Sequence, residues 1–243
     1  MKNTIGFWGY PNKKTIQEYK TRYPSAKFVD LDIDFNYPKL SLAPDAYCTI
    51  IKNIINNAYY LKDELIAILA PIGKDKCDSA FFVAEILKKD GFNVVETVFE
   101  DKCPDISKLS LPISKSNLPL KRKIELITAN IIEQKDYSNL PQTKAQFGFW
   151  GVPPNDLDLL DLFPNQTEVF GWCRAVEANF PGDYEIESFV EPNLPTIFFT
   201  QSFCSKTLLA KYLANKYQGL YIDVDNTPNN SIKAKIEAFI KLR

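Results

Sequence analysis

The chain has 243 residues, 45% of them hydrophobic and 13% aromatic, so it can form one large domain or two small ones. Its 29 basic and 30 acidic residues balance, which argues against a broad nucleic-acid-binding face. No apolar run approaches the length of a membrane span, and no hydrophobic signal segment stands near the start. We therefore expect a cytoplasmic protein that binds neither membranes nor nucleic acids.

The first 100 residues alternate between strand and helix patterns. Apolar runs and alternating stretches predict strands at 4–10, 26–35, 64–72 and 93–100. Helical spacing predicts helices at 11–24, 45–63 and 76–92, the last of which is stopped by Gly91 as the residue after the cap. This order is typical of a mostly parallel sheet covered by helices, so residues 1–100 are predicted to form a first α/β lobe.

The next segment, 101–145, is predicted to be a linker followed by a bridging helix. Residues 101–118 are rich in Pro, Ser and Lys, as linkers and loops often are. Residues 120–134 have the spacing of a helix.

Residues 146–243 are predicted to form a second α/β lobe. Strands are expected at 146–153, 184–191, 195–201 and 219–225. Helices are expected at 155–164, 205–219 and 231–242, with Gly219 closing the second of them. The stretch 167–178 fits either a strand or a helix.

The tetrapeptide Gly-Phe-Trp-Gly occurs twice, around Trp8 and Trp150, and a proline follows each copy after one further residue. The stretch 64–95 also resembles 195–224 in its order of strand, cysteine, helix, glycine and strand. These matches predict two pseudo-repeated Rossmann-like lobes with mostly parallel sheets and an interlobe cleft that binds a small molecule. Each tryptophan either contacts a flat ligand in that cleft or packs in the core.

The chain has no histidine, which excludes Ser-His-Asp and Cys-His catalysis and histidine-ligated metals. Its five cysteines are scattered without a CxxC pair, so we expect reduced thiols rather than a zinc knuckle. They are Cys48, Cys77, Cys103, Cys173 and Cys204.

The loop around Cys204 is the leading candidate for chemistry. Cys204 lies between a predicted buried strand and a predicted helix, where the helix dipole and a nearby lysine would lower the pKa of the thiol. Polar neighbours crowd the same loop and could hold an anion; they are Gln201, Ser202, Ser205 and Lys206. Cys77 has the matching place in the first lobe, although acidic residues flank it. The alternative is that both thiols are structural.

Arg174 stands beside Trp172 in an apolar segment. An arginine in such a place can clamp a carboxylate or phosphate of a ligand. The alternative is an ordinary surface ion pair with Glu177, three residues further on.

Two acidic runs have alternating carboxylates. Asp30, Asp32 and Asp34 either hold Mg²⁺ or Mn²⁺ or form the solvent-facing side of a strand. Asp223 and Asp225 have the same spacing at the end of a predicted strand and are the candidate metal ligands of the second lobe.

The stretch 205–226 resembles the DxD region of glycosyltransferases that use a metal and a nucleotide sugar. Residues 148–153 and 171–189 loosely match the opening strand and a later segment of those enzymes. The resemblance implies that Asp223 and Asp225 bind a metal and a diphosphate. The sequence departs from the pattern at Lys206, where an acidic residue is usual, and at Gln218, which replaces a glycine.

The length, the repeat and the paired cysteines are also similar to two-lobed racemases, which place one cysteine per lobe across a cleft. That resemblance implies a role only for Cys77 and Cys204. The residues that follow these cysteines differ from the serine- or threonine-rich signatures of the racemases.

The leading hypothesis is an enzyme that acts on a small anionic molecule through Cys204 and its polar loop. The alternatives are a metal-dependent nucleotide-sugar transferase and a non-catalytic binding or regulatory protein. The sequence indicates neither a cofactor nor an oligomeric state.

Overall fold

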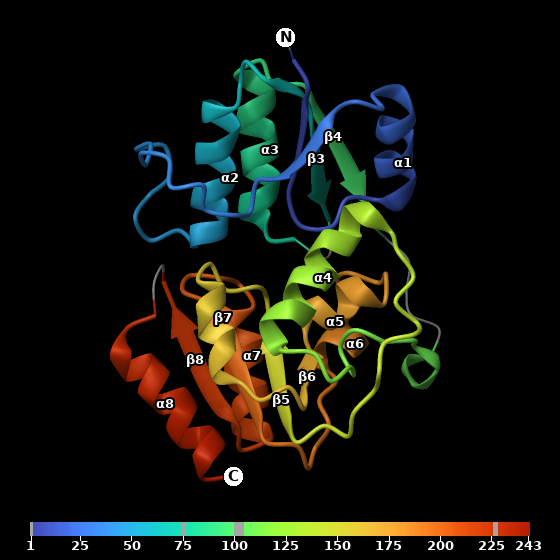
Figure 1. Cartoon of the computed structure of the whole chain (residues 1–243). Helices are drawn as coiled ribbons and strands as arrows, with labels where there is room; N and C mark the ends of the chain where they lie inside the picture. Colours follow the sequence, from blue (N-terminus) through green and yellow to red (C-terminus); the bar gives the residue numbers. More distant parts are fainter. Residues whose placement is uncertain (1, 74–75, 100–104, 226–227) are drawn as a thin grey trace. The chain divides into compact units, whose positions relative to one another are not determined.

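The computed structural model describes residues 2–73, 76–99, 105–225 and 228–243. The chain divides into two compact lobes, Met1–Glu100 and Asp101–Arg243. Each lobe contains a four-stranded, all-parallel sheet interleaved with helices (Figure 1). The predicted α/β class is therefore confirmed, while the interlobe cleft stays a prediction.

The first lobe has the strand order β2-β1-β3-β4. Its elements are β1 (Thr4–Phe7), α1 (Lys13–Arg22), β2 (Lys27–Asp30), α2 (Thr49–Tyr60), β3 (Leu65–Ile72), α3 (Asp78–Lys89) and β4 (Val94–Val98). Figure 1 shows α2 and α3 packed together, with α1 on the other side of the strands. This order reverses between β1 and β3, and loops that follow the two strands at such a point lead to opposite faces of the sheet.

The second lobe has the equivalent order β6-β5-β7-β8. Its elements are η1 (Ile106–Lys108), α4 (Leu120–Glu133), β5 (Phe147–Gly151), η2 (Leu157–Leu162), β6 (Thr167–Phe170), α5 (Trp172–Glu177), α6 (Tyr184–Ser188), β7 (Thr196–Gln201), α7 (Thr207–Lys216), β8 (Leu220–Val224) and α8 (Asn230–Lys241). Helix α4 packs against α5, η2 and β6, and α7 packs against β7 and β8. The described part of the predicted linker also packs in this lobe, because Leu111 joins an apolar cluster with residues of α5 and α6.

The two tryptophans of the repeated tetrapeptide lie at the carboxyl end of the first strand of each lobe. Both side chains are buried, and each indole nitrogen donates to a backbone oxygen. Trp8 donates to Pro71 of β3 over 3.2 Å, whereas Trp150 donates to Glu187 of α6 over 2.6 Å. Trp150 also packs with Phe170, Phe198 and Ala210 in the core beneath α7.

The predicted strand at 26–35 is wrong in its second half, because β2 ends at Asp30. Residues 31–40 instead run as an irregular segment against α2. Three buried asparagines of α2 hold its backbone. Asn53 donates to Asp32, Asn57 donates to Leu31 and Ile33, and Asn56 bonds to Pro38 and Leu40. The side chains of a helix thus satisfy backbone groups that a longer strand would have paired.

The strand predicted at 184–191 is also wrong, since residues 184–188 form the short helix α6. The Asp183 carboxylate accepts from the Ile186 N–H over 3.2 Å, and this N-cap outweighs the alternating pattern that follows it. The ambiguous stretch at 167–178 contains both possibilities, β6 and then α5.

Helix ends agree with the predictions in one lobe and differ in the other. Gly91 follows α3 with a φ of +84°, as expected for the residue after the cap. After α7 the left-handed residue is Gln218, with a φ of +52°, rather than Gly219. Gly219 is needed for a different reason, because a Cβ there would overlap the Thr196 carbonyl and the Phe198 ring.

Candidate functional site

The best-developed site lies at the carboxyl edge of the second sheet, where β7 leads into α7. The buried side chain of Gln201, at the end of β7, crosses this edge. In the amide orientation that satisfies both of its polar atoms, its nitrogen donates to the Asp225 carbonyl over 2.9 Å and its oxygen accepts from the Asn155 N–H over 3.2 Å. Gln201 therefore ties together the loops that follow β5, β7 and β8.

Cys204 lies in a tight turn immediately after Gln201. Its N–H donates to the Gln201 carbonyl over 3.1 Å, and its own carbonyl accepts from the Thr207 N–H over 3.0 Å. Phe203 inside the turn has a φ of +62°, which is unusual for a residue with a bulky side chain. The turn leaves Cys204 half-buried, one turn ahead of the first residue of α7.

The N-terminus of α7 has no side-chain cap, and Lys206 stands at the cap position. In the described part of the chain, the N–H groups of Ser205 and Lys206 donate to no backbone carbonyl. Ser205 is exposed. N–H groups without an acceptor at the start of a helix can bind an anion.

The ammonium of Lys206 forms an ion pair with the Glu187 carboxylate. The Glu187 side chain is only 6% exposed, against 22% for Lys206, and Trp150 fixes its backbone through the indole hydrogen bond. The pair offsets the charge of Lys206, so this lysine adds less positive potential beside Cys204 than its sequence position suggests. Glu187 is the residue of this site that the sequence analysis missed, because its segment was predicted as a strand.

Two buried polar atoms at this edge lack a partner in the described structure. They are Oε1 of Glu187 and Nδ2 of Asn155. A buried polar atom without a hydrogen bond costs about 1–3 kcal/mol, so both atoms favour a further polar group at this edge.

Asp223 of β8 lies in a network of hydroxyl groups. One carboxylate oxygen accepts from the Ser202 hydroxyl, and the other accepts from the Tyr221 hydroxyl over 3.1 Å. Burial is the main reason why the pKa of Tyr221 is raised, and the neighbouring Asp223 raises it further. Tyr221 therefore stays protonated and remains a donor to Asp223.

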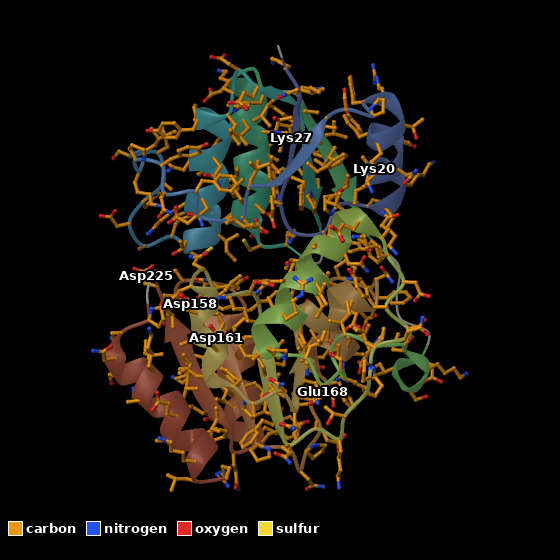
Figure 2. The ribbon with its side chains drawn as sticks, viewed as in Figure 1. Lys20, Lys27, Asp158, Asp161, Glu168 and Asp225 are labelled. Atoms are coloured by element: carbon orange, nitrogen blue, oxygen red, sulfur yellow. The ribbon has the colours of Figure 1, made fainter. Side chains whose placement is uncertain are left out.

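Asp223 and Asp225 are the candidate metal ligands of this lobe, and a metal ion needs several ligand atoms around it. Among the described residues no group of three or more His, Cys, Asp or Glu side chains could hold one. Both oxygens of Asp223 already accept from hydroxyls, and Asp225 is exposed at the end of its strand. A metal held by described protein side chains alone is therefore not supported, and a metal shared between Asp223, Asp225 and the phosphates of a ligand stays a prediction. Asp225 is labelled in Figure 2, together with Asp158 and Asp161 of η2, whose carboxylates both pair with Lys121.

Arg174 does not form a surface pair with Glu177, and its role as a ligand clamp stays a prediction. It is buried and pairs with Glu168 of β6 over 2.7 Å, and its guanidinium lies over the rings of Phe170 and Phe189 at 4.7 and 4.9 Å. Glu168 is labelled in Figure 2.

Glu177, which the sequence analysis offered as a partner of Arg174, accepts instead from the backbone N–H groups of Ile113 and Ser114. The surface-pair alternative is therefore wrong.

The remaining thiols differ in their surroundings. Cys77 in the first lobe is half-exposed at the N-cap of α3, and Cys48 is buried at the N-cap of α2. Cys173 is fully buried, and burial raises the pKa of its thiol, so it stays protonated. Cys103 lies outside the described residues. Of the described cysteines, Cys204 and Cys77 are the accessible ones.

Asp30, Asp32 and Asp34 do not share the solvent-facing side of a strand, as one reading of the sequence expected. Asp34 is partly exposed and pairs with Lys39 over 2.7 Å. Asp32 is half-buried and accepts from the Gly9 N–H over 2.8 Å. The segment bends after Asp30, and this turns the second carboxylate back toward β1.

Comparisons with known proteins identify no family for this chain. No protein-family model matches the chain, and no curated protein matches it. A solved structure, the RedJ thioesterase of the prodiginine biosynthetic pathway in Streptomyces coelicolor, is similar at 10% identity with a TM-score of 0.23. The match covers 98% of this chain and 90% of the thioesterase, but a TM-score this low carries no argument about function. No described helix is both long and apolar enough to cross a membrane.

Proposed function

We propose that the protein is an enzyme acting on a small anionic molecule, which binds at the N-terminus of α7 with Cys204 as the reacting thiol. One observation carries the proposal. A half-exposed thiol lies next to N–H groups that donate to no backbone carbonyl of the described residues, at the start of a ten-residue helix. The positive end of a helix dipole favours both a bound anion and a thiolate.

Neighbouring residues divide into those that would touch the ligand and those that position the loop. Ser205 and Lys206 offer backbone N–H groups, whereas the Ser202 hydroxyl beside the same turn would have to exchange its bond to Asp223 for one to the ligand. Gln201 and Trp150 are buried and bind other protein groups, so we assign them positioning roles. The Lys206–Glu187 pair leaves the site close to neutral, which favours a singly charged molecule over a polyphosphate.

Rate-resolved alkylation with iodoacetamide, followed by peptide mass spectrometry, tests this proposal. Cys204 is expected to react at least tenfold faster than Cys77, which serves as the accessible control thiol in the other lobe. Saturating phosphate or acetate should slow Cys204 and leave Cys77 unchanged. Equal rates for the two thiols, or no protection by any anion, would refute the cysteine-centred site.

Activity and binding measurements on variants separate the other functional classes. Turnover lost in Cys204→Ser supports an enzyme, whereas ligand binding without turnover would indicate a regulatory protein. Synergistic calorimetric binding of Mn²⁺ and a nucleoside diphosphate that is lost in Asp225→Asn would favour the nucleotide-sugar transferase. The described cysteines are outside any disulfide, which supports a reducing, cytoplasmic compartment.

We further propose that the two lobes are an internal repeat with Trp8 and Trp150 equivalent. The shared strand order and the shared position of the tryptophans support this. Superposition of residues 4–100 on 146–228 in an experimental structure tests it. Tryptophans on non-equivalent elements would refute it.

A further inference from the structure

A second group of polar side chains lies at the carboxyl edge of the first sheet, apart from the Cys204 site. Strand β1 ends in the turn at Gly9, and the adjacent strand β2 ends at Asp30. Two acids at this edge are held by backbone N–H groups. The Asp30 carboxylate accepts from the Asp32 N–H over 3.0 Å, and the Asp32 carboxylate accepts from the Gly9 N–H over 2.8 Å. Burial raises the pKa of both carboxyls, and the neighbouring Asp32 raises that of Asp30 further. The two acids are therefore held together at some electrostatic cost.

Two buried oxygen atoms at this edge accept from no donor among the described residues. One is Oδ1 of Asp32, and the other is Oδ1 of Asn53, a residue of α2 that is only 1% exposed. They belong to touching residues, since the Asn53 amide nitrogen donates to the Asp32 carbonyl over 2.9 Å. Both atoms are acceptors, so the group that satisfies them must bring two donors.

Positive side chains stand at the same edge. The Lys76 side chain lies directly over Gly9, in the place that a Cβ would occupy, and its charge lowers the pKa of Asp32. Lys13 and Lys14 begin α1, the helix that leaves this edge after β1, and the described structure gives neither an ion pair. The acceptors at the end of β2 thus have the Lys76 ammonium close by, and the helix that follows β1 begins with two lysines.

We propose that this edge binds a phosphorylated sugar, whose neighbouring hydroxyls donate to Asp32 and Asn53 and whose phosphate lies toward Lys13 and Lys14. An acid at the end of the second strand of a β-α-β unit is well placed to accept from ribose hydroxyls. Neighbouring strands are about 4.8 Å apart, so the hydroxyls and the phosphate of one sugar can reach both strand ends. The Lys76 ammonium opposes a divalent cation at the same acceptors.

Isothermal titration calorimetry with ribose 5-phosphate, 2-deoxyribose 5-phosphate and AMP tests this site. Ribose 5-phosphate should bind, and its 2-deoxy analogue should bind at least tenfold more weakly, because one donor is missing. Comparable or tighter binding of AMP would identify the sugar as part of a nucleotide, and its failure to bind would identify a free sugar phosphate. Both of these results support the proposal.

Variants assign the binding to the named residues. Asp32→Asn and Asn53→Leu should each weaken ribose 5-phosphate at least tenfold, whereas the surface control Asp34→Asn should not. Asp32 also holds Gly9, so urea unfolding of each variant will check that it is folded, and Asn53→Leu leaves the Gly9 contact in place. The proposal is overturned if neither ribose 5-phosphate nor AMP binds, or if both ribose forms bind equally. Mg²⁺ or Ca²⁺ binding that is lost in Asp32→Asn would also overturn it, in favour of a cation site.

Discussion

The indole nitrogen of Trp150 donates a 2.6 Å hydrogen bond to the backbone oxygen of Glu187, while the carboxylate of Glu187 holds the ammonium of Lys206. A core residue of the second sheet is thereby connected, through one glutamate, to the start of α7. The position of the candidate thiol loop therefore depends on the packing of the tryptophan.

Replacing Trp150 with phenylalanine is expected to destabilise the protein by roughly 2–4 kcal/mol. The change leaves the Glu187 carbonyl without its donor, at about 1–3 kcal/mol, and adds a cavity beside Phe198. Urea unfolding measures the loss. The matched variant Trp8→Phe, whose hydrogen bond is longer at 3.2 Å, should lose less. A loss for Trp150→Phe below that of Trp8→Phe would contradict this prediction.

Lys123 should make stability depend on pH in alkaline solution. Its buried amine donates to the carbonyls of Asn165 and Thr167, at 3.0 and 2.6 Å, and burial lowers its pKa to about 8. Between pH 8 and the ordinary lysine pKa of 10.5, the unfolded chain holds a proton that the folded chain has released. The free energy of unfolding contributed by this group therefore rises with pH across that window.

The measurement is the free energy of unfolding from pH 7 to 10.5 for the parent protein, Lys123→Met and Lys121→Met. The rise should disappear only in Lys123→Met, because Lys121 is a surface residue paired with Asp158. Parallel profiles for all three proteins would mean that Lys123 is not the titrating group.

Gly9 should tolerate alanine much less well than Gly91. Both have positive φ angles, +54° and +84°, so either change costs about 1–2 kcal/mol of backbone strain. A Cβ at Gly9 would also overlap the Lys76 side chain, whereas a Cβ at Gly91 meets nothing. Thermal unfolding should therefore show a larger drop for Gly9→Ala. Adding Lys76→Ala should recover part of it, and equal drops without recovery would show that Lys76 moves aside freely.

The sequence predicted the regular parts of both lobes because their strands are apolar runs and their helices have clear periodicity. It failed where one side chain decides the local structure. Asp183 starts a helix in a segment with strand alternation, and the asparagines of α2 hold a segment that resembles a strand. For the site, sequence order placed Cys204 and Lys206 at a strand–helix junction correctly. It could not give the Lys206–Glu187 pair, because the two residues are 19 positions apart and belong to different elements.

The asparagines at 53, 56 and 57 have a consequence for how the first lobe assembles. The Leu31 N–H donates to Phe7 of β1, but beyond it the described backbone of residues 32–40 pairs with no strand. Its ordering depends on amide groups that have the right geometry only once α2 is helical. The segment is therefore ordered only when α2 is folded. In hydrogen exchange its amide protons should open together with those of α2 rather than with those of β2, although β2 is its immediate neighbour in the chain.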